Sequence, residues 1–497
     1  MHSPRRTAIV ILADGARADV FERLLASGEL PEIAQHVTER GGYRRATSTF
    51  TSTTIPAHLP FLTGRFAGSA NVPGYRWFDR TKFRAGLPLG PWCFRSYNGP
   101  ESRLVDRDLA PLAPTLFELA PGSVNIFGAI TRGVARRDNL GGLRKNKLWL
   151  DAHYREDYTS ADEKARELLI DSLDKPAPFT FAVMPGVDWN SHYDDPFGEA
   201  THDAYRRIDR CVGAIARKLK RLGRYDETML AVVSDHGHAP VHEHFDLAVR
   251  MEEDHELRVA YHSMRAWRVR AQAICAVSGN AMAHVYMRSE GGWSFVNGRG
   301  GIDAAAPALI GQLIESPSVD LIATRYGSGA ILIESDRGSA RLHESIEDGE
   351  LKLVYEVFGG DPFGFEQMPL RMTSEQALRL TADSTHPDAL MQLAQLFRSP
   401  RTGDMVVSAA AGHDLRERYE RPEHRSSHGA LHDQHMSVPL AISEPLTDGP
   451  LRTADVFSMV TSWIGVEPPD NTDGVSRLAA DYVESPLVAE VAVASPA

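Results

Sequence analysis

Continuous apolar runs constrain the fold of this chain more than any other feature. Residues 7–12, 179–184 and 228–233 are apolar or small throughout and carry no charge. Runs that are continuous, rather than alternating with polar residues, are typical of strands buried on both faces of a sheet. Residues 205–222, between the last two runs, repeat apolar side chains at helical spacing with Arg and Lys on the other face. Strand, helix and strand in this order predict a mostly parallel α/β sheet covered by helices on both faces.

A change in the sequence pattern marks a second part of the chain. Between residues 242 and 399, short strand-like segments such as 282–286 and 329–333 alternate with turns and charged stretches. We interpret this part as an inserted α+β subdomain that shapes a pocket, with the chain returning to the main sheet at 403–407. The predicted units are a core of residues 5–241 and 400–480, the insertion 242–399 and a flexible tail 481–497.

The composition argues against several classes of protein. The 497 residues include 54 Lys and Arg against 66 Asp and Glu, a net charge of −12, so no broad basic face is available for nucleic acid as a structural partner. No apolar run approaches the roughly 18 residues of a membrane span. The first run is too short for a signal peptide and is followed by Asp14 and Arg17. Cys93, Cys211 and Cys275 are widely spaced, so we expect buried, reduced thiols in a cytoplasmic protein.

Acidic and histidine side chains gather in short segments at the expected ends of strands. In open α/β sheets, ligands bind beyond the carboxyl ends of the strands, and Asp and His are ligands of divalent metals such as zinc. Each segment alone has an ordinary alternative, such as a capping turn or a satisfied polar loop. The segments are Asp14-Gly15, Asp188-Trp189-Asn190-Ser191-His192, Ser234-Asp235-His236-Gly237-His238 and Ser426-Ser427-His428-Gly429.

A segment rich in hydroxyl groups, residues 51–58, supplies a candidate nucleophile. A hydroxyl becomes nucleophilic when an adjacent base or a bound metal lowers its pKa. No base signature surrounds this segment, so metal activation is the consistent interpretation. The alternative is a Ser/Thr-rich loop that caps a helix whose first turn holds Pro56.

Taken in order, these segments resemble the alkaline phosphatase superfamily, and within it the nucleotide pyrophosphatase/phosphodiesterase branch. The branch has Asp-Gly after the first strand, Thr-apolar-Pro-x-His, Asp-x-x-x-His, Ser-Asp-His-Gly and a late Ser/Thr-His-Gly. This chain offers Asp14-Gly15, Thr54-Ile55-Pro56-Ala57-His58, Asp188 to His192, Ser234 to Gly237 and Ser427-His428-Gly429. The resemblance implies an alkaline-phosphatase-like core and an enzyme that hydrolyses a small phosphodiester or pyrophosphate.

The resemblance also implies a site with two divalent metal ions, usually zinc. Carried over by residue, one ion is held by Asp14, Asp235, His236 and Thr54, and the other by Asp188, His192 and His428. The two ions would activate the Thr54 hydroxyl and stabilise the leaving oxygen, with a covalent phosphothreonine-type intermediate.

The sequence departs from the branch at the substrate side. The branch usually has an aromatic residue after the nucleophile, whereas this chain has Ile55, which cannot stack on a base. A phosphoryl-contacting Asn has no fixed counterpart, which leaves Asn71, Tyr75 and Arg76 as candidates. Arg132 is the candidate for binding a terminal phosphate if the substrate is a monoester.

Other activities of the same fold stay open from the sequence. A phosphomonoesterase or a phosphonoacetate-type hydrolase would use the same ligands, and a catalytically silent metal-binding module is the non-enzymatic alternative. A sulfatase is not expected, because the segment 54–58 lacks the Cys or Ser and the Arg that sulfatases need. The physiological substrate and the oligomeric state are not predicted.

Overall fold

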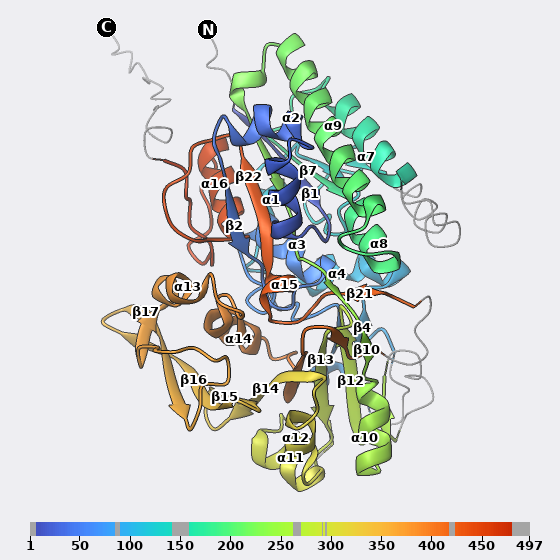
Figure 1. The fold of residues 1–497 in the computed structure, drawn as a ribbon, viewed down its shortest axis with the longest axis vertical. Helices are drawn as coiled ribbons and strands as arrows, with labels where there is room; N and C mark the ends of the chain where they lie inside the picture. The colour runs from blue at the N-terminus through green and yellow to red at the C-terminus, as the bar shows by residue number, and fades with distance from the viewer. Residues whose placement is uncertain are drawn as a thin grey trace, which may run out of the picture.

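The computed structural model describes residues 6–84, 90–141, 159–261, 270–290, 292–293, 296–416 and 423–479. The predicted tail 481–497 lies outside these residues. Two large β-sheets, one toward each end of the molecule, organise the described chain (Figure 1). The first belongs to the predicted core, and the second is built mainly from the predicted insertion.

The core sheet has eight strands and is mostly parallel, as the sequence predicts. Its order is β23-β2-β22-β8-β1-β7-β5-β6. Strand β22 pairs antiparallel with both β8 and β2, while β1 pairs parallel with β7 and β8. The strands are β1 (Thr7–Ala13), β2 (Gly42–Thr47), β5 (Val124–Ile126), β6 (Asn139–Leu140), β7 (Phe179–Met184), β8 (Thr228–Val233), β22 (Ser437–Ile442) and β23 (Leu451–Arg452).

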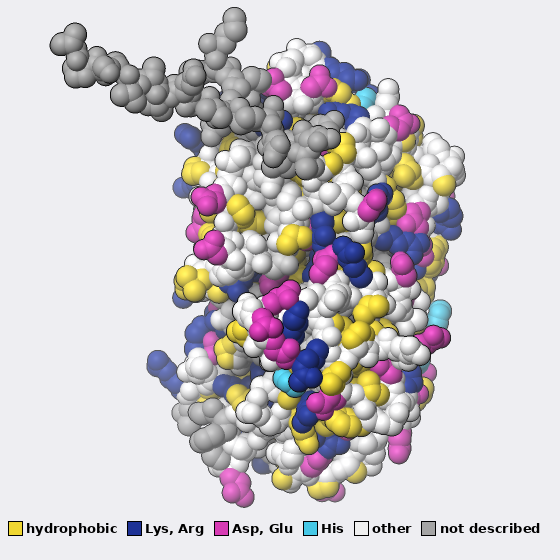
Figure 2. Space-filling view, turned by 90° about the vertical axis from the view of Figure 1, so that its left-hand side faces the viewer, with side chains coloured by type: hydrophobic (Ala, Val, Ile, Leu, Met, Phe, Trp, Pro, Cys, Tyr) yellow, Lys and Arg dark blue, Asp and Glu magenta, His cyan; other side chains and the backbone are white. Residues whose placement is uncertain are grey.

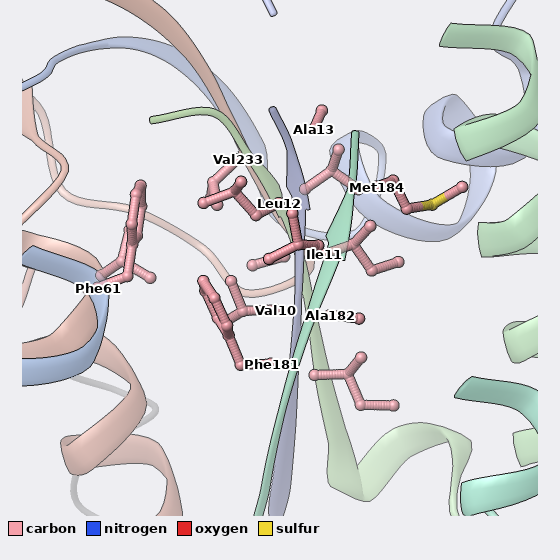
Figure 3. Packing of buried hydrophobic residues seen from close by; sticks show 14 of the residues in the cluster. Val10, Ile11, Leu12, Ala13, Phe61, Phe181, Ala182, Met184 and Val233 are labelled. Carbon is pink, nitrogen blue, oxygen red and sulfur yellow. The ribbon is translucent and has the colours of Figure 1, made fainter. Parts of the chain in front are cut away.

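The three apolar runs form the centre of this sheet because helices cover both of its faces. Every residue of β1, β7 and β8 is buried. Figure 3 shows side chains of β1 between two layers, with Phe61 from one helix on one side and Met184 facing helices on the other. Phe61 contacts Phe181 of β7, with ring centroids 6.5 Å apart. The predicted layering, a sheet between helices, is therefore observed.

The helices of the core lie on both sides of the sheet (Figures 1 and 3). The amphipathic segment 205–222 is the main part of α9, as predicted. The longer core helices are α1 (Ala18–Ala26), α3 (Thr54–Thr63), α7 (Thr159–Ser172), α8 (Gly186–Tyr193), α9 (Glu199–Arg221) and α16 (Asp455–Ile464). The shorter ones are α2 (Pro31–Ile33), α4 (Val105–Asp108), α5 (Leu116–Leu119) and α15 (Asp433–Met436).

The second sheet has nine strands in the order β11-β12-β13-β19-β14-β15-β16-β17-β18 and is almost entirely antiparallel. Its strands are β11 (Val259–Ala260), β12 (Ala273–Ser278), β13 (Met282–Met287), β14 (Val319–Tyr326), β15 (Ala330–Ser335), β16 (Gly338–Glu347), β17 (Glu350–Phe358), β18 (Arg371–Thr373) and β19 (Met405–Ala409). Its helices are α10 (Leu247–His255), α11 (Arg299–Ala305), α12 (Leu309–Ile314), α13 (Ser374–Thr381) and α14 (Ala389–Arg398).

One sequence prediction about this sheet is wrong. Residues 403–407 were expected to rejoin the main sheet, but β19 pairs antiparallel with β13 and β14 in the second sheet. Hydrophobic clusters pack against both faces of β19, so its sequence is a continuous apolar run like that of a central strand of the core. The chain re-enters the core sheet at β22.

Three pairs of short strands form separate two-stranded sheets. Strand β9 (Ala239–Pro240) pairs with β21 (Ser426–Ser427), β10 (Glu243–His244) with β20 (His413–Asp414), and β3 (Arg76–Phe78) with β4 (Phe94–Ser96). The three cysteines are buried, as expected. On the face in Figure 2, basic and acidic side chains are interspersed. Within the described ranges, no helix combines the length and apolar character needed to cross a membrane.

Candidate active site

The carboxyl ends of three neighbouring strands bring the acidic residues together. Asp14 follows β1, Asp188 lies in α8 after β7, and Asp235 follows β8. Since β8, β1 and β7 are adjacent and parallel, the segments that follow them meet at one edge of the sheet. The backbone N–H of Gly15 donates to Asp235 Oδ1 at 3.2 Å, which ties the first and third segments together.

Two further segments complete the site from outside the central strands. Thr54 is the first residue of α3, and the loop before that helix pairs with the loop of His428 through a bridge between Ser52 and Gly429. This backbone contact therefore holds the loop before Thr54, the predicted nucleophile, next to the loop that contains His428. Thr54 is half-buried, whereas His428 is buried.

The first cluster surrounds the Thr54 hydroxyl. Its Oγ1 lies 3.3 Å from His236 Nε2. The same nitrogen is 3.6 Å from Asp14 Oδ1 and 3.5 Å from Asp235 Oδ2. The Nδ1 of His236 lies 3.1 Å from the carbonyl oxygen of Gly237, so Nδ1 carries the hydrogen and Nε2 faces Thr54 with a lone pair. A hydroxyl, two carboxylates and an imidazole thus converge.

The second cluster centres on Asp188. Its Oδ1 lies 3.5 Å from His192 Nε2 and 3.9 Å from His428 Nε2. Asp188 and His192 are four residues apart on α8, as the sequence predicts for a helical segment. His236 and His428 stack with ring centroids 3.9 Å apart, so the two clusters adjoin.

The site buries three carboxylates among histidine side chains. Asp14, Asp188 and Asp235 are at most 6% exposed. Burial would raise the pKa of the Asp188 and Asp235 carboxyls, but neighbouring histidines lower it below its ordinary value in both cases. Burial lowers the pKa of the His428 imidazole well below 6.5, an effect that nearby histidines reinforce. Ionised carboxylates and neutral imidazoles are the donor set that zinc-like cations bind, so these residues fit divalent metal ions.

Two histidines join the site that the predicted ligand sets omit. His238 Nε2 lies 2.7 Å from Asp188 Oδ1, and His58 Nε2 lies 3.2 Å from Asp235 Oδ2. Three groups of buried side chains within the described residues could hold a metal ion: Asp188 with His192, His238 and His428, Asp14 with Asp188 and His236, and Asp14 with His58 and Asp235. Both histidines lie within the sequence segments quoted above, 51–58 and 234–238. This position was the signal in the sequence that could have identified them as site residues.

Most of the predicted substrate-binding residues have partners of their own within the protein. Ile55 follows Thr54 in α3 and is 5% exposed. The Asn71 amide oxygen accepts from the Ser399 hydroxyl at 2.9 Å, and Tyr75 packs edge-on against Tyr97. Asn71 therefore contacts the residue that follows α14, and Tyr75 contacts the residue that follows β4.

Arg132, the candidate for a terminal phosphate, is bound within the core. Its Nε donates to Glu118 at 3.0 Å, and its guanidinium also donates to the carbonyl oxygens of Ala110 and Ala113. These bonds join the loop of Arg132 to α5 and the segment before it. The structure therefore shows which groups Arg132 contacts, and its role as a phosphate ligand stays a prediction.

The fold and the convergent site define an alkaline-phosphatase-like α/β protein. Residues 8–89 and 123–294, slightly more than half of the chain, match the family model of type I phosphodiesterase / nucleotide pyrophosphatase. The chain belongs to this family. A mouse protein, bis(5'-adenosyl)-triphosphatase enpp4, is 22% identical over 243 residues, which are 46% of this chain and 47% of the mouse protein. The match thus spans about half the length of this curated relative.

Solved structures share the fold over nearly the whole chain. Phosphonoacetate hydrolase from Sinorhizobium meliloti 1021, in complex with phosphonoacetate, has a TM-score of 0.55 and 16% identity, covering 93% of this chain and 96% of its own. Murine ectonucleotide pyrophosphatase/phosphodiesterase 5, an inactive variant in complex with AMP, has a TM-score of 0.53 and 14% identity, covering 97% and 99%. These similarities establish the alkaline-phosphatase-like architecture that the sequence motifs imply.

Proposed function

We propose that this protein hydrolyses a phosphodiester or pyrophosphate bond, with Thr54 as nucleophile and two divalent metal ions, most consistently Zn²⁺, as cofactors. The observation that carries the proposal is the half-buried Thr54 hydroxyl at the start of α3, 3.3 Å from His236 Nε2 and beside two buried carboxylates. Asp14, Asp235 and His236 would share the first ion with Thr54. Asp188, His192 and His428 would hold the second.

The proposed reaction has two displacements at phosphorus. When bound, the metal ions would lower the pKa of the Thr54 hydroxyl and neutralise charge on the phosphoryl group. Thr54 Oγ1 forms a bond to phosphorus while the bond to the leaving oxygen breaks. Its position as the first residue of α3 places it beside backbone N–H groups that have no partner within the helix and can face a phosphoryl oxygen. Water then cleaves the phosphothreonine and restores the hydroxyl.

The substrate is a small molecule in this proposal. The mouse relative is named as a bis(5'-adenosyl)-triphosphatase, which favours a pyrophosphate or diester bond. A phosphonate is the second candidate, because Ile55 offers no ring for a nucleobase and a phosphonoacetate hydrolase shares the fold. The expected absence of nucleic acid as a structural partner and the cytoplasmic location stay predictions.

Replacing Thr54 tests the proposal against an adjacent control. We expect Thr54→Ala to keep its fold and most of its bound metal, and to lose hydrolysis of bis-p-nitrophenyl phosphate by roughly a thousandfold or more. Thr53 is also buried, but its side chain makes no capping hydrogen bond to α3, so Thr53→Ala is expected to stay within a few-fold of wild type. Metal content by mass spectrometry and circular dichroism accompany each rate.

The outcomes separate the candidate functions. A preference for bis-p-nitrophenyl phosphate over p-nitrophenyl phosphate and phosphonoacetate supports the diesterase, and the reverse order moves the assignment to a monoesterase or a phosphonate hydrolase. Equal turnover by wild type and Thr54→Ala would remove Thr54 as nucleophile. Wild-type protein that binds no zinc would overturn the two-metal proposal.

A further inference from the structure

His238 occupies a position between the second metal cluster and the loop of Ser426. Its Nε2 lies 2.7 Å from Asp188 Oδ1, nearer than the corresponding atoms of His192 and His428 at 3.5 and 3.9 Å. The His238 side chain has no solvent exposure. The contact is therefore the shortest in the cluster and is shielded from water.

The hydrogen-bond partners around His238 determine which of its ring nitrogens carries the hydrogen. The Ser426 hydroxyl donates to the carbonyl oxygen of Ser191 at 2.7 Å, so its hydrogen is already used. Toward His238 Nδ1, 2.9 Å away, the same oxygen can act only as an acceptor. His238 therefore carries its hydrogen on Nδ1, and in the neutral ring a lone pair on Nε2 faces the Asp188 carboxylate.

The two other imidazoles of the cluster are oriented in the same way. His192 Nδ1 lies 2.9 Å from the carbonyl oxygen of Ser426, and His428 Nδ1 lies 3.2 Å from the carbonyl oxygen of Ser52. A carbonyl oxygen only accepts, so both rings also carry the hydrogen on Nδ1. Three lone pairs on Nε2 thus face one carboxylate. Metal-ligating histidines show this arrangement, with the second nitrogen fixed by an outer acceptor.

Two acceptors cannot face each other at 2.7 Å without a cation between them. The ligand atoms of Asp188, His192, His238 and His428 all lie within 4.8 Å of one another. One carboxylate and three imidazoles are four donors of the kinds that zinc binds.

We propose that His238 is a fourth protein ligand of the second metal ion, beyond the three ligands that the family resemblance implies. The inference rests on the proposed two-metal function. A second ion with four protein ligands is held more firmly than one with three, whereas the first ion, which includes the Thr54 hydroxyl among its ligands, stays the more exchangeable of the two.

The test compares His238→Gln with His192→Ala and His432→Gln. Glutamine can keep a hydrogen bond to Asp188 but cannot supply an imidazole nitrogen. His192→Ala removes a ligand of the predicted set, and His432 is a buried histidine outside the cluster. Zinc affinity is measured by competition with a chromophoric chelator. The cobalt(II)-loaded proteins are compared by visible absorption, which reports coordination number, and by X-ray absorption, which counts imidazoles.

We expect His238→Gln to weaken the more tightly bound zinc by tenfold or more, to alter the cobalt spectrum and to remove one imidazole, as His192→Ala does. His432→Gln should match wild type. Wild-type affinity and spectrum in His238→Gln, beside a clear effect of His192→Ala, would make His238 a positioning residue and overturn the inference while the proposed function stands. A wild-type protein that binds no zinc would instead overturn the proposed function itself.

Discussion

At the residue scale, Gly15 controls how closely the first and second segments of the site approach. It has a φ of +74°, and a Cβ there would lie 2.9 Å from the Cα of Asp188 and 2.9 Å from the ring of His238. A left-handed conformation costs an L-residue about 1–2 kcal/mol. We therefore expect Gly15→Ala to lower stability by more than this and to weaken zinc binding at least tenfold, as measured by urea unfolding and chelator competition.

Gly28 provides the matched control for this prediction. Its φ is +78°, but a Cβ there meets nothing within 4 Å. Gly28→Ala should therefore lose only the conformational term of about 1 kcal/mol and keep its metal and activity. Equal metal affinity in the two variants would show that the contact of Gly15 with Asp188 does not hold the site.

The residues predicted from the sequence do converge, and the reason is topological. Asp14, Asp188 and Asp235 each follow a buried strand, and parallel neighbouring strands bring such positions to one edge. The contacts of His58 and His238 were missed because their motifs specify spacing along the chain, not the direction of a side chain. Asn71 and Arg132 were assigned from counting and charge alone, and neither indicates what a loop residue contacts after folding.

At the element scale, helix α8 depends on a buried acid of α7. Asp162 Oδ1 accepts the N–H of Gly186, the first residue of α8, at 2.9 Å, and Oδ2 accepts from Arg207 of α9 at 3.0 Å. Burial raises the pKa of Asp162 to about 6 although Arg207 opposes this shift. Asp162→Ala would leave Arg207 buried without its carboxylate, so we expect a loss of about 3–5 kcal/mol in unfolding free energy. Because α8 carries Asp188 and His192, weaker zinc binding should accompany that loss.

The neighbouring Glu163 is the control on the same helix. It pairs with Arg166 at 2.8 Å on a partly exposed surface. Exposed ion pairs contribute at most about 1 kcal/mol, so Glu163→Ala should unfold close to wild type and keep its zinc affinity. A similar loss in both variants, measured by urea unfolding, would contradict the role assigned to Asp162.

Strands were predictable where the apolar composition of a segment alone shows that the segment is buried. Strands β1, β7 and β8 were predicted because a continuous apolar run requires cover on both faces. Strand β19 satisfies the same requirement inside the second sheet, which explains its wrong assignment to the core. An apolar run shows that a strand is buried, but it carries no information about which strand lies beside it.

At the scale of the whole molecule, the second sheet closes one side of the site. Gly279, in the turn between β12 and β13, has a φ of +63°, and a Cβ there would lie 2.8 Å from His428 Nδ1. The next residue, Asn280, donates to His424 Nδ1 at 3.1 Å, and the ring of His424 packs on His192. Stability of the interface between the two sheets is therefore coupled to the integrity of the site.

The same interface contains a buried histidine that predicts acid sensitivity. His284 of β13 accepts the N–H of Gly403 on Nδ1 at 3.3 Å, and its Nε2 lies 3.0 Å from the carbonyl oxygen of Pro73 in the core loop. Only the neutral ring can accept on Nδ1, whereas the Nε2–H group can donate to Pro73 in either protonation state. Burial lowers the pKa of His284 from 6.5 to about 4. The unfolded chain therefore binds a proton that the folded protein excludes between these pH values, and stability falls as pH decreases through this window.

Replacing His284 isolates this contribution. For these two pKa values, linkage gives a loss of about 2 kcal/mol in unfolding free energy between pH 7 and pH 5. We expect His284→Gln to be less stable than wild type at pH 7 but to show a pH dependence smaller by about this amount, as measured by urea unfolding at both pH values. The exposed His242, replaced by Gln, should keep the wild-type dependence. An unchanged pH dependence in His284→Gln would place the acid-sensitive proton on another residue. The absolute stability at pH 7 does not affect this conclusion, because only the difference in stability between the two pH values is compared.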